Sequence, residues 1–358
     1  PRALAFSLYK TLITDDAWRI ARREMGYATP IGQPLMISLA GQPFIDTRLS
    51  FHSFLPNELS ASISHKLVSG WVKRLRNSPE LHDKIEFDVA ITTFCFDIDS
   101  KMDKLIGDTL NSEEKSEFRA AHRQLAFNLL SDIGQGGISS ALHRIETLVG
   151  KQHSPDEAFE GNQFLELFAM IENCILYGTV PFSILARHGF IARTILISLS
   201  SCGVFTKQEV DEIQSGIRTV ASDLVKDMHE LQLGKISRKS FMKQYGHLRP
   251  GTYNILSKRY DQMAGFGEED AVSYKEEKHV PFELSVLQKT KINNLLEEEG
   301  FEGINAETLM DYIEAATVGR EYSKFVFTRS VSDMLELISE FGEEHGLSRE
   351  EMSHIPLN

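Results

Sequence analysis

The stretch TKQEVDEIQSGIRTVASDLVKDMHELQLG, residues 206–234, carries the clearest helical pattern in the chain. Thr206 and Glu209 have the spacing of a capping box, in which two side chains satisfy free backbone N–H groups at a helix start. Apolar residues then follow at steps of three and four, and Gly234 is a typical stop. These apolar positions are Ile213, Ile217, Val220, Leu224, Met228 and Leu231. The pattern predicts one long amphipathic helix.

Working outward, similar spacing predicts further helices over residues 8–25, 57–77 and 321–345. Two β-prone runs in PLMISLAGQPFIDTRLSF, residues 34–51, flank a turn and predict a hairpin. IEFDVAITTFCFDID, residues 85–99, alternates apolar and polar residues at its start and predicts a strand with one buried face. The expected fold is therefore mainly α, a multi-helix substrate domain with a small antiparallel β element near the N-terminus.

The expected organisation has three portions. Residues 1–110 form an α+β portion with the hairpin, residues 111–263 a helical portion, and residues 282–358 C-terminal helices packed with the part before them. The polar, glycine-containing stretch 264–281 is expected to be a mobile surface loop between two helical blocks. Because the sequence starts abruptly at Pro1, we expect it to be a fragment of a larger chain.

Composition narrows the possible partners. The chain has 358 residues, 42% of them hydrophobic, and a formal charge of -13, which disfavours attraction to nucleic acid or anionic lipid. No apolar run is expected to reach the length of a membrane span, since the longest candidate, residues 189–203, is too short. Cys95, Cys174 and Cys202 lie far apart in apolar stretches, which predicts buried free thiols and a cytoplasmic location.

YGHLRPGTYNILSKRYDQ, residues 245–262, breaks a helical region with two glycines and a proline. Such a backbone lets a ligand approach closely, and Pro250 pushes Arg249 out of helical geometry. Arg249 offers a planar fork for a carboxylate or phosphoryl group, and His247 is a candidate acid or base. The alternative is a helix-ending turn in which Arg249 pairs with a nearby carboxylate and His247 is only packed.

Two other charged groups are candidates for substrate binding. Arg320 and Lys324, in GREYSKFVFTRS at 319–330, share a helix face and either line an anion pocket or are solvated surface charge. Asp46 and Arg48 are two apart, so on a strand they face the same side. They either pair with each other or grip the two ends of an amino acid.

Several familiar sites are not indicated. DIGQGGISS, residues 132–140, matches no phosphate-binding pattern and predicts a break between two helices. His82 and Asp83 are adjacent, but no metal-ligand spacing surrounds them, so we predict no metal site in this chain. The absence of a nucleophile motif argues against an autonomous hydrolase.

At this point a family resemblance can be stated. FMKQYGHLRPGTYNI, residues 241–255, resembles the YGHRGPGExD-type segment in the middle portion of the phosphoenolpyruvate synthase and pyruvate phosphate dikinase-like phosphotransferases. Residues 319–347 are similar to the RExxRF-containing helix that follows in those proteins. Thr252 stands where an acidic residue is common in those proteins, and Arg249 is displaced by one position.

Three further segments, residues 1–19, 41–56 and 177–192, look closer to the L-glutamine kinase and rifampicin phosphotransferase branches. The resemblance implies an AMP-forming kinase in which an ATP-grasp domain, using ATP and Mg²⁺, phosphorylates a histidine on a swivelling domain. Neither domain is recognisable here. This piece would be the acceptor-binding domain for L-glutamine or a related small molecule, inactive alone and without a cofactor of its own.

Under that resemblance, the site residues take roles. Arg249 with Arg320 and Lys324 would cancel phosphoryl charge, and His247 would handle the acceptor's proton. Asp46, Arg48 and Arg187 would help to bind the acceptor, together with the turn residues Gly251, Thr252 and Tyr253. The alternative, which the sequence leaves open, is a helical protein-interaction or regulatory module without its own small-molecule site.

Overall fold

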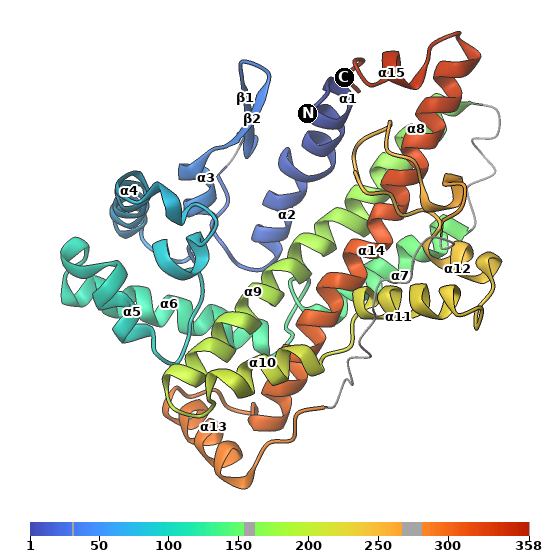
Figure 1. The fold of residues 1–358 in the computed structure, drawn as a ribbon. Coiled ribbons are helices and arrows are strands. Elements are labelled where there is room, and N and C mark those ends of the chain that lie inside the picture. Colours follow the sequence, from blue (N-terminus) through green and yellow to red (C-terminus); the bar gives the residue numbers. More distant parts are fainter. Residues whose placement is uncertain (31, 154–161, 267–280, 358) are drawn as a thin grey trace.

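The fold is built around two long helices that run antiparallel through the middle of the molecule. The computed structural model describes residues 1–358 apart from 31, 154–161, 267–280 and 358. In Figure 1, α9 (Val180–Ser201) and α14 (Ala306–Glu344) cross the centre side by side. A Cβ built on Gly319 would lie 3.1 Å from Leu185, and one built on Gly178 would lie 3.0 Å from Phe327. Small residues thus let these helices approach closely.

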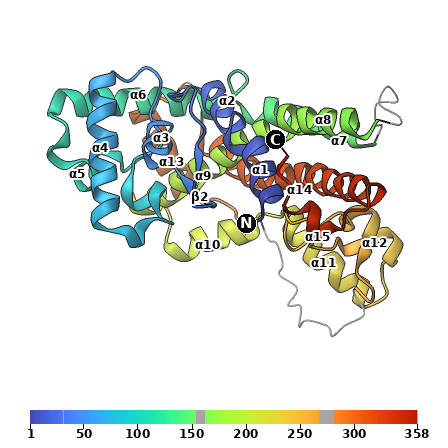
Figure 2. The same cartoon turned by 90° about the horizontal axis from the view of Figure 1, so that it is seen from above.

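The other elements surround this pair, as the view from above shows (Figure 2). α1 and α2 run beside α9, α4 to α6 extend to one side, and α11 and α12 pack on the opposite side near α14 (Figure 1). The remaining α-helices are Ala3–Tyr9 (α1), Ala17–Glu24 (α2), Thr47–His52 (α3), Ala61–Asn77 (α4), Ile98–Leu105 (α5), Ser112–Leu130 (α6), Ile138–His153 (α7), Gln163–Cys174 (α8), Lys207–Gly216 (α10), Val220–Gln232 (α11), Arg238–Tyr245 (α12), Val286–Glu298 (α13) and Arg349–Met352 (α15).

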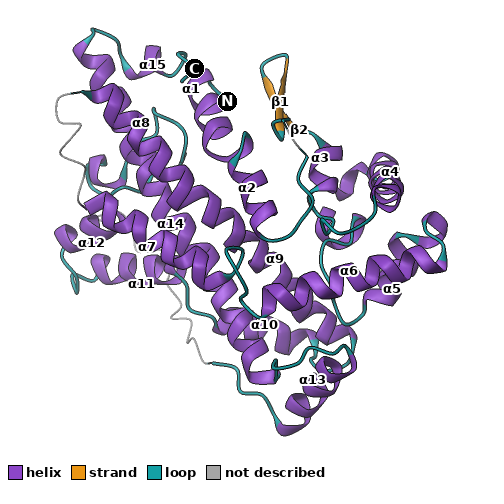
Figure 3. Ribbon diagram, turned by 180° about the vertical axis from the view of Figure 1, so that it is seen from behind, coloured by secondary structure: helices purple, strands orange, loops and turns teal. Residues whose placement is uncertain are grey.

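Short helical turns of other types connect some of these helices. π-helical turns lie at Lys10–Thr14, Ile85–Val89 and Ile175–Thr179, and 3₁₀ turns at Pro79–Leu81, Gly107–Thr109 and Tyr260–Gln262. The predicted hairpin is confirmed: β1 (Met36–Leu39) pairs antiparallel with β2 (Gln42–Ile45), the small sheet seen in Figure 3. The mainly α fold with a small antiparallel element near the N-terminus is therefore present.

The hydrophobic core is continuous through the molecule. It contains Leu8 and Trp71 from the first expected portion, Ile184 from the second and Leu335 from the third. The first and last α-helices also meet, because the Leu4 N–H donates to the Ser353 carbonyl at 3.2 Å and Arg2 pairs with Glu350. Residues 267–280, most of the stretch predicted to be a surface loop, lie outside the described residues.

The predicted strand at residues 85–92 is wrong. Residues 85–89 form a π-helical turn, and residues 89–95, which follow, are buried between helices. Side chains rather than a neighbouring strand satisfy two backbone carbonyls here, since Arg74 donates to the Asp88 carbonyl at 2.9 Å and Arg187 to the Thr92 carbonyl at 2.5 Å. The alternating residues begin in a partly exposed turn, residues 85–88, and continue into a buried segment, residues 89–95.

The single helix predicted over 206–234 is also wrong, because it is two helices. Thr206 and Glu209 do form the predicted capping box at the start of α10. The helix ends at Gly216, Ile217 is extended, and α11 begins after Thr219, whose N–H donates to Ser222 Oγ at 2.9 Å. Gly216 is a helix stop signal and Thr219 a helix start signal. The apolar spacing continues across both residues, so it does not show the break.

Two smaller expectations also change. Cys95 and Cys174 are buried free thiols, as predicted, but Cys202 is exposed at the end of α9. Residues 163–201 form one continuous helical run of 39 residues, which by length and composition alone could cross a membrane, unlike the shorter stretch considered from sequence. Core helices of soluble proteins meet the same criterion, and here much of α9 packs against α14, α7 and α2.

The predicted break at residues 132–140 is confirmed between α6 and α7, and it provides a stability test. A Cβ on Gly136 would lie 2.5 Å from the Glu24 carbonyl oxygen and 2.7 Å from Met25 Cα, so both neighbours are backbone atoms. We expect Gly136→Ala to lower the free energy of unfolding by about 2 kcal/mol through overpacking. Urea denaturation measures this.

Gly150 in α7 is the matched control, because a Cβ there would meet nothing within 4 Å. Gly150→Ala should leave stability unchanged or raise it by up to about 1 kcal/mol through helix propensity. Equal effects of the two substitutions would contradict the close approach at Gly136.

Candidate functional site

The turn 245–262 is fastened to α14 by Arg249. This side chain is 7% exposed, and its guanidinium donates to Ser332 Oγ at 3.0 Å, to the Ser257 carbonyl at 3.1 Å and to Glu336 at 2.7 Å. Arg249 therefore has internal partners for its planar fork. Of the two alternatives that the sequence left open, the structure shows the paired arginine of a helix-ending turn.

Glu336 is the centre of this attachment. It also accepts hydrogen bonds from Gln262 at 2.7 Å and Arg349 at 3.2 Å, so the turn, α14 and α15 meet at one carboxylate. Burial opposes its charge, but the hydrogen bonds from Arg349, Gln262 and Arg249 outweigh burial and lower the pKa of Glu336 to about 2. The group is a structural anion at neutral pH.

His247 is enclosed beside the same helix. It is 1% exposed, its ring lies 4.9 Å from the ring of Phe325, and its carbonyl accepts from Ser332 Oγ at 2.7 Å. Burial, with the nearby charges of Arg329 and Arg259, lowers the pKa of His247 to about 3. A neutral, enclosed imidazole does not have the properties expected of an acid or base acting near pH 7.

The other turn residues are also used internally. The Gly251 N–H donates to Ser257 Oγ at 3.0 Å, and the Tyr253 ring packs edge-on against Tyr9 at 5.2 Å. Burial raises the pKa of Tyr253. Thr252 is partly exposed.

Asp46 and Arg48 do not lie on a strand, as their spacing had suggested. β2 ends at Ile45, and the Asp46 carboxylate caps α3 by accepting from the N–H groups of Arg48 at 2.9 Å and Leu49 at 3.1 Å. Arg48 is an exposed helical residue. The pair therefore shares a helix start, where the carboxylate satisfies free backbone donors.

Arg187 lies in a different part of the molecule from Arg249. Its neighbour His188 hydrogen-bonds Tyr312, and Leu185 packs on Gly319, whereas Arg249 contacts Ser332. At 1.5 Å per residue, Gly319 and Ser332 are about 20 Å apart along α14. The structure therefore does not bring these two arginines into one pocket.

Arg187 forms the centre of a buried polar cluster. It is 1% exposed, pairs with Glu86, and donates to the Tyr27 hydroxyl at 3.1 Å and the Thr92 carbonyl at 2.5 Å. Burial lowers the pKa of the Arg187 guanidinium, but the interactions with Tyr27 and Glu86 are together stronger, so the pKa is raised. The cluster joins α9, the segment that follows α2, and the π-helical turn Ile85–Val89 with the residues after it.

His188, next to Arg187, has a defined protonation state. Its Nε2 lies 2.7 Å from the Gly136 carbonyl, which only accepts, so Nε2 carries the proton and Nδ1 accepts from the Tyr312 hydroxyl at 2.9 Å. Burial lowers the pKa of His188 to about 4. This histidine joins three elements as a neutral group.

Arg320 and Lys324 remain on the surface of α14, as predicted for an i, i+4 pair. The Arg320 guanidinium lies 5.6 Å from the ring of Phe190, which is 6.3 Å from Phe87, and Arg193 lies 5.6 Å from Phe87. We call Arg193, Phe87, Phe190, Arg320 and Lys324 the cationic strip. Of the predicted site residues, Arg320 and Lys324 in this strip, and Arg48 elsewhere, offer exposed positive charge.

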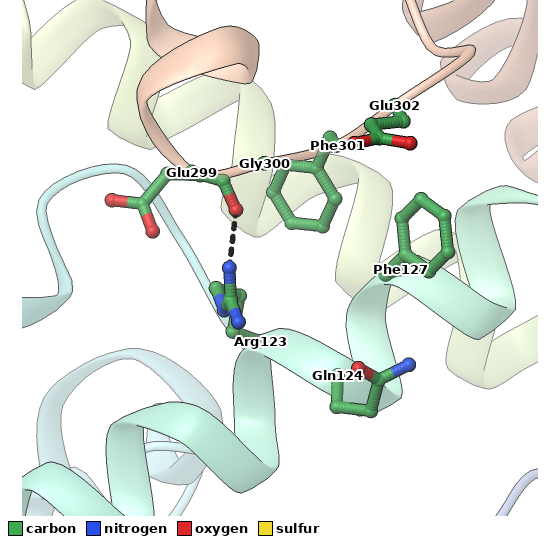
Figure 4. Close-up of a pocket in the computed structure, with 7 residues that line it drawn as sticks. All are labelled: Arg123, Gln124, Phe127, Glu299, Gly300, Phe301 and Glu302. Carbon is green, nitrogen blue, oxygen red and sulfur yellow. Dashed lines mark hydrogen bonds between the residues drawn. The ribbon is translucent and has the colours of Figure 1, made fainter.

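A small pocket lies elsewhere, between α6 and the connection from α13 to α14 (Figure 4). Its volume is about 180 Å³, below the roughly 300 Å³ at which small-molecule sites begin. Arg123 reaches across it and donates to the Glu299 carbonyl at 2.7 Å, with Phe127 and Phe301 forming apolar walls. None of the predicted site residues lines it.

The residues that sequence reasoning missed are Arg22, Tyr27 and Glu86. Tyr27 and Glu86 bond Arg187, and the Arg22 guanidinium lies beside them. Glu86 was assigned to the polar face of a strand, although it points to Arg187. A charged residue within an otherwise apolar stretch was the available signal for Arg187, but its partners are distant in sequence.

The comparisons with known proteins add no assignment. No protein-family model matches the chain, and neither a curated protein nor a solved structure matches it. Among the described residues, no group of three or more His, Cys, Asp or Glu side chains has the arrangement of a metal site.

The pKa of His247 gives a direct test. Because its folded value is about 3 against about 6.5 when unfolded, the imidazole should stay neutral in the folded chain at pH 5. The folded state then binds fewer protons, so this group's contribution to stability falls as pH drops from 6.5 towards 3. NMR titration of the His247 ring measures this, and titration near pH 6.5 would contradict the enclosed placement.

Arg249 gives a second test. Arg249→Met leaves part of the charge of Glu336 uncompensated and removes the attachment to Ser332, so we expect a loss of about 3 kcal/mol in the free energy of unfolding. Lys324→Met, an exposed change on α14, should alter the free energy of unfolding by no more than about 0.5 kcal/mol. Chemical denaturation of both variants decides the matter, and similar small losses would show that Arg249 does not hold the turn.

Proposed function

We propose that this chain is the acceptor-binding portion of an ATP-dependent phosphotransferase in which a phosphohistidine delivers the phosphoryl group. The observation that supports this is the contact between the two segments that carry the family resemblance. Residues 241–255 and 319–347 are far apart in sequence, yet Arg249 of the first bonds Ser332 and Glu336 of the second. Residues of the resembling segments thus define one structural unit.

In this proposal Arg249 and His247 have positioning roles rather than the chemical roles that the sequence suggested. Arg249 holds the turn against α14, and His247 fills the space beside Phe325. The phosphoryl oxygens would instead meet the exposed charges of Arg320 and Lys324 in the cationic strip. Positive side chains at such a place offset the charge of the transferred group and help to align it with the acceptor.

The proposal also includes the other domains of the phosphotransferase. ATP and Mg²⁺ would be bound by an ATP-grasp domain, and a swivelling histidine domain would visit the strip, both supplied by the parent chain. The acceptor is a small molecule, with L-glutamine as the first candidate, and the location is the cytoplasm. No nucleic acid or membrane takes part.

A second candidate function is a helical protein-interaction or regulatory module. It is favoured by the exposed apolar side chains of Phe164, Leu165 and Phe168 on α8, and of Leu176 in the following π-helical turn, which are between 49% and 62% exposed. Apolar side chains gathered on one helix are a common feature of binding surfaces.

Calorimetry of the 358-residue chain separates the two. We expect saturable binding of L-glutamine or a related amino acid, and weak binding of inorganic phosphate that falls about tenfold in Arg320→Gln/Lys324→Gln. Lys235→Gln, on the connection between α11 and α12, is the control. No saturable binding of any amino acid or of phosphate would contradict the acceptor-binding function and favour the interaction module.

A further inference from the structure

The guanidinium of Arg22 is enclosed without a counter-charge of its own. Arg22 lies in α2, and its Cζ is 5.5 Å from the ring centroids of both Tyr27 and Phe54. Its Nη1 is fully buried and has no hydrogen-bond partner among the described residues. Burial, then the charge of Arg187, lowers the pKa of Arg22 to about 10, so the side chain remains a cation at neutral pH.

Arg187 shares the same surroundings. Its Cζ is 5.3 Å from the ring centroids of both Tyr27 and Phe54, so two guanidinium groups are set against the same two rings. Two adjacent buried cations repel each other and lose the hydration they would have in water. Arrangements of this kind are stable when anions complete them.

The charges of Arg22, Arg187 and Glu86 sum to one net positive charge. Glu86 is the carboxylate that acts on Arg22, and its carboxylate is bonded to Arg187. His122 is close enough for the charge of Arg187 to act on it, but burial lowers its pKa to about 3, so it is neutral. Two guanidinium cations therefore face one carboxylate.

His122 adds unused hydrogen-bonding capacity. It is 0% exposed, and neither of its ring nitrogens has a partner among the described residues. A buried polar group without a partner in the protein is uncommon, and a water, an ion or a ligand can supply the partner. His122 and Arg22 are thus two unsatisfied groups in the surroundings of Arg187.

We infer that Arg22 and Arg187 form a binding site for one carboxylate group of a small molecule. A planar guanidinium donates two parallel hydrogen bonds to a carboxylate, and one negative charge completes the count of two cations and one anion. A dianion such as sulfate would bring one negative charge more than the two arginines and Glu86 require for neutrality. The flanking rings of Tyr27 and Phe54 exclude water, and the low local dielectric strengthens such a hydrogen bond.

The site is near solvent at the π-helical turn Ile85–Val89. Glu86 lies on this turn with a side chain 16% exposed, and Arg22 is partly exposed away from its Nη1. Phe87, the next residue, belongs to the cationic strip on the surface. π-helical turns are frequent at functional sites. This inference does not depend on phosphotransfer, because it follows from charge and burial alone.

Acetate is the probe for the test. At equal ionic strength we expect sodium acetate to raise the thermal unfolding midpoint of the chain more than sodium chloride does, because a ligand of the folded state stabilises it. Sodium sulfate is the control for general salt stabilisation: it stabilises folded proteins by exclusion from their surface, so its effect should be the same in Arg22→Met as in the original chain. An equal rise with chloride would indicate a simple halide site, and that result, or no rise with acetate, overturns the inference.

Arg22→Met tests the location. The difference between acetate and chloride should fall about tenfold or more, as expected for the loss of a hydrogen bond between charged groups. Without acetate, this variant should be at least as stable as the original chain, because an apolar side chain replaces an uncompensated cation. Arg23→Met, which removes the exposed arginine next to Arg22 on α2, should keep the full acetate effect.

Each contrary outcome for Arg22→Met is informative. A retained acetate effect would place acetate elsewhere. A less stable or unfolded variant would show that the Arg22 charge is already balanced in the protein, and the inference would be wrong. A purely structural arginine would give this second result, so stability and acetate binding together separate the two roles.

Discussion

The close antiparallel packing of α9 on α14 is the constraint on which the other parts of the structure depend. Gly178 and Gly319 lie where a side chain would meet the opposite helix, so the two backbones approach as far as their neighbours allow. α7, α8 and α2 then pack around this pair. Both the turn 245–262 and the buried arginine cluster take their positions from it, the first through Ser332 and the second through Arg187.

The α fold could be predicted because helices leave local signals. Caps such as Thr206 with Glu209, and apolar steps of three and four, depend on residues close in sequence. The same locality explains the errors. The period of residues 213–231 continues across the break at Gly216. The alternation at 85–92 cannot distinguish a half-buried strand from a partly exposed helical turn that leads into a buried segment.

The candidate site was less predictable, because partners of charged residues come from distant segments. Arg249 was correctly seen as a planar fork, but Glu336 is 87 residues away and no local signal pairs them. Glu86 and Arg187 are 101 residues apart. The sequence therefore indicated which side chains are chemically capable, whereas packing decides which of them are already engaged.

The length of α14 has a mechanical consequence. Its 39 residues form a rod of about 58 Å that contacts the buried arginine region near Tyr312 and the turn 245–262 near Ser332. One continuous helix therefore fixes the spacing of these two places along its axis, at about 30 Å between Tyr312 and Ser332.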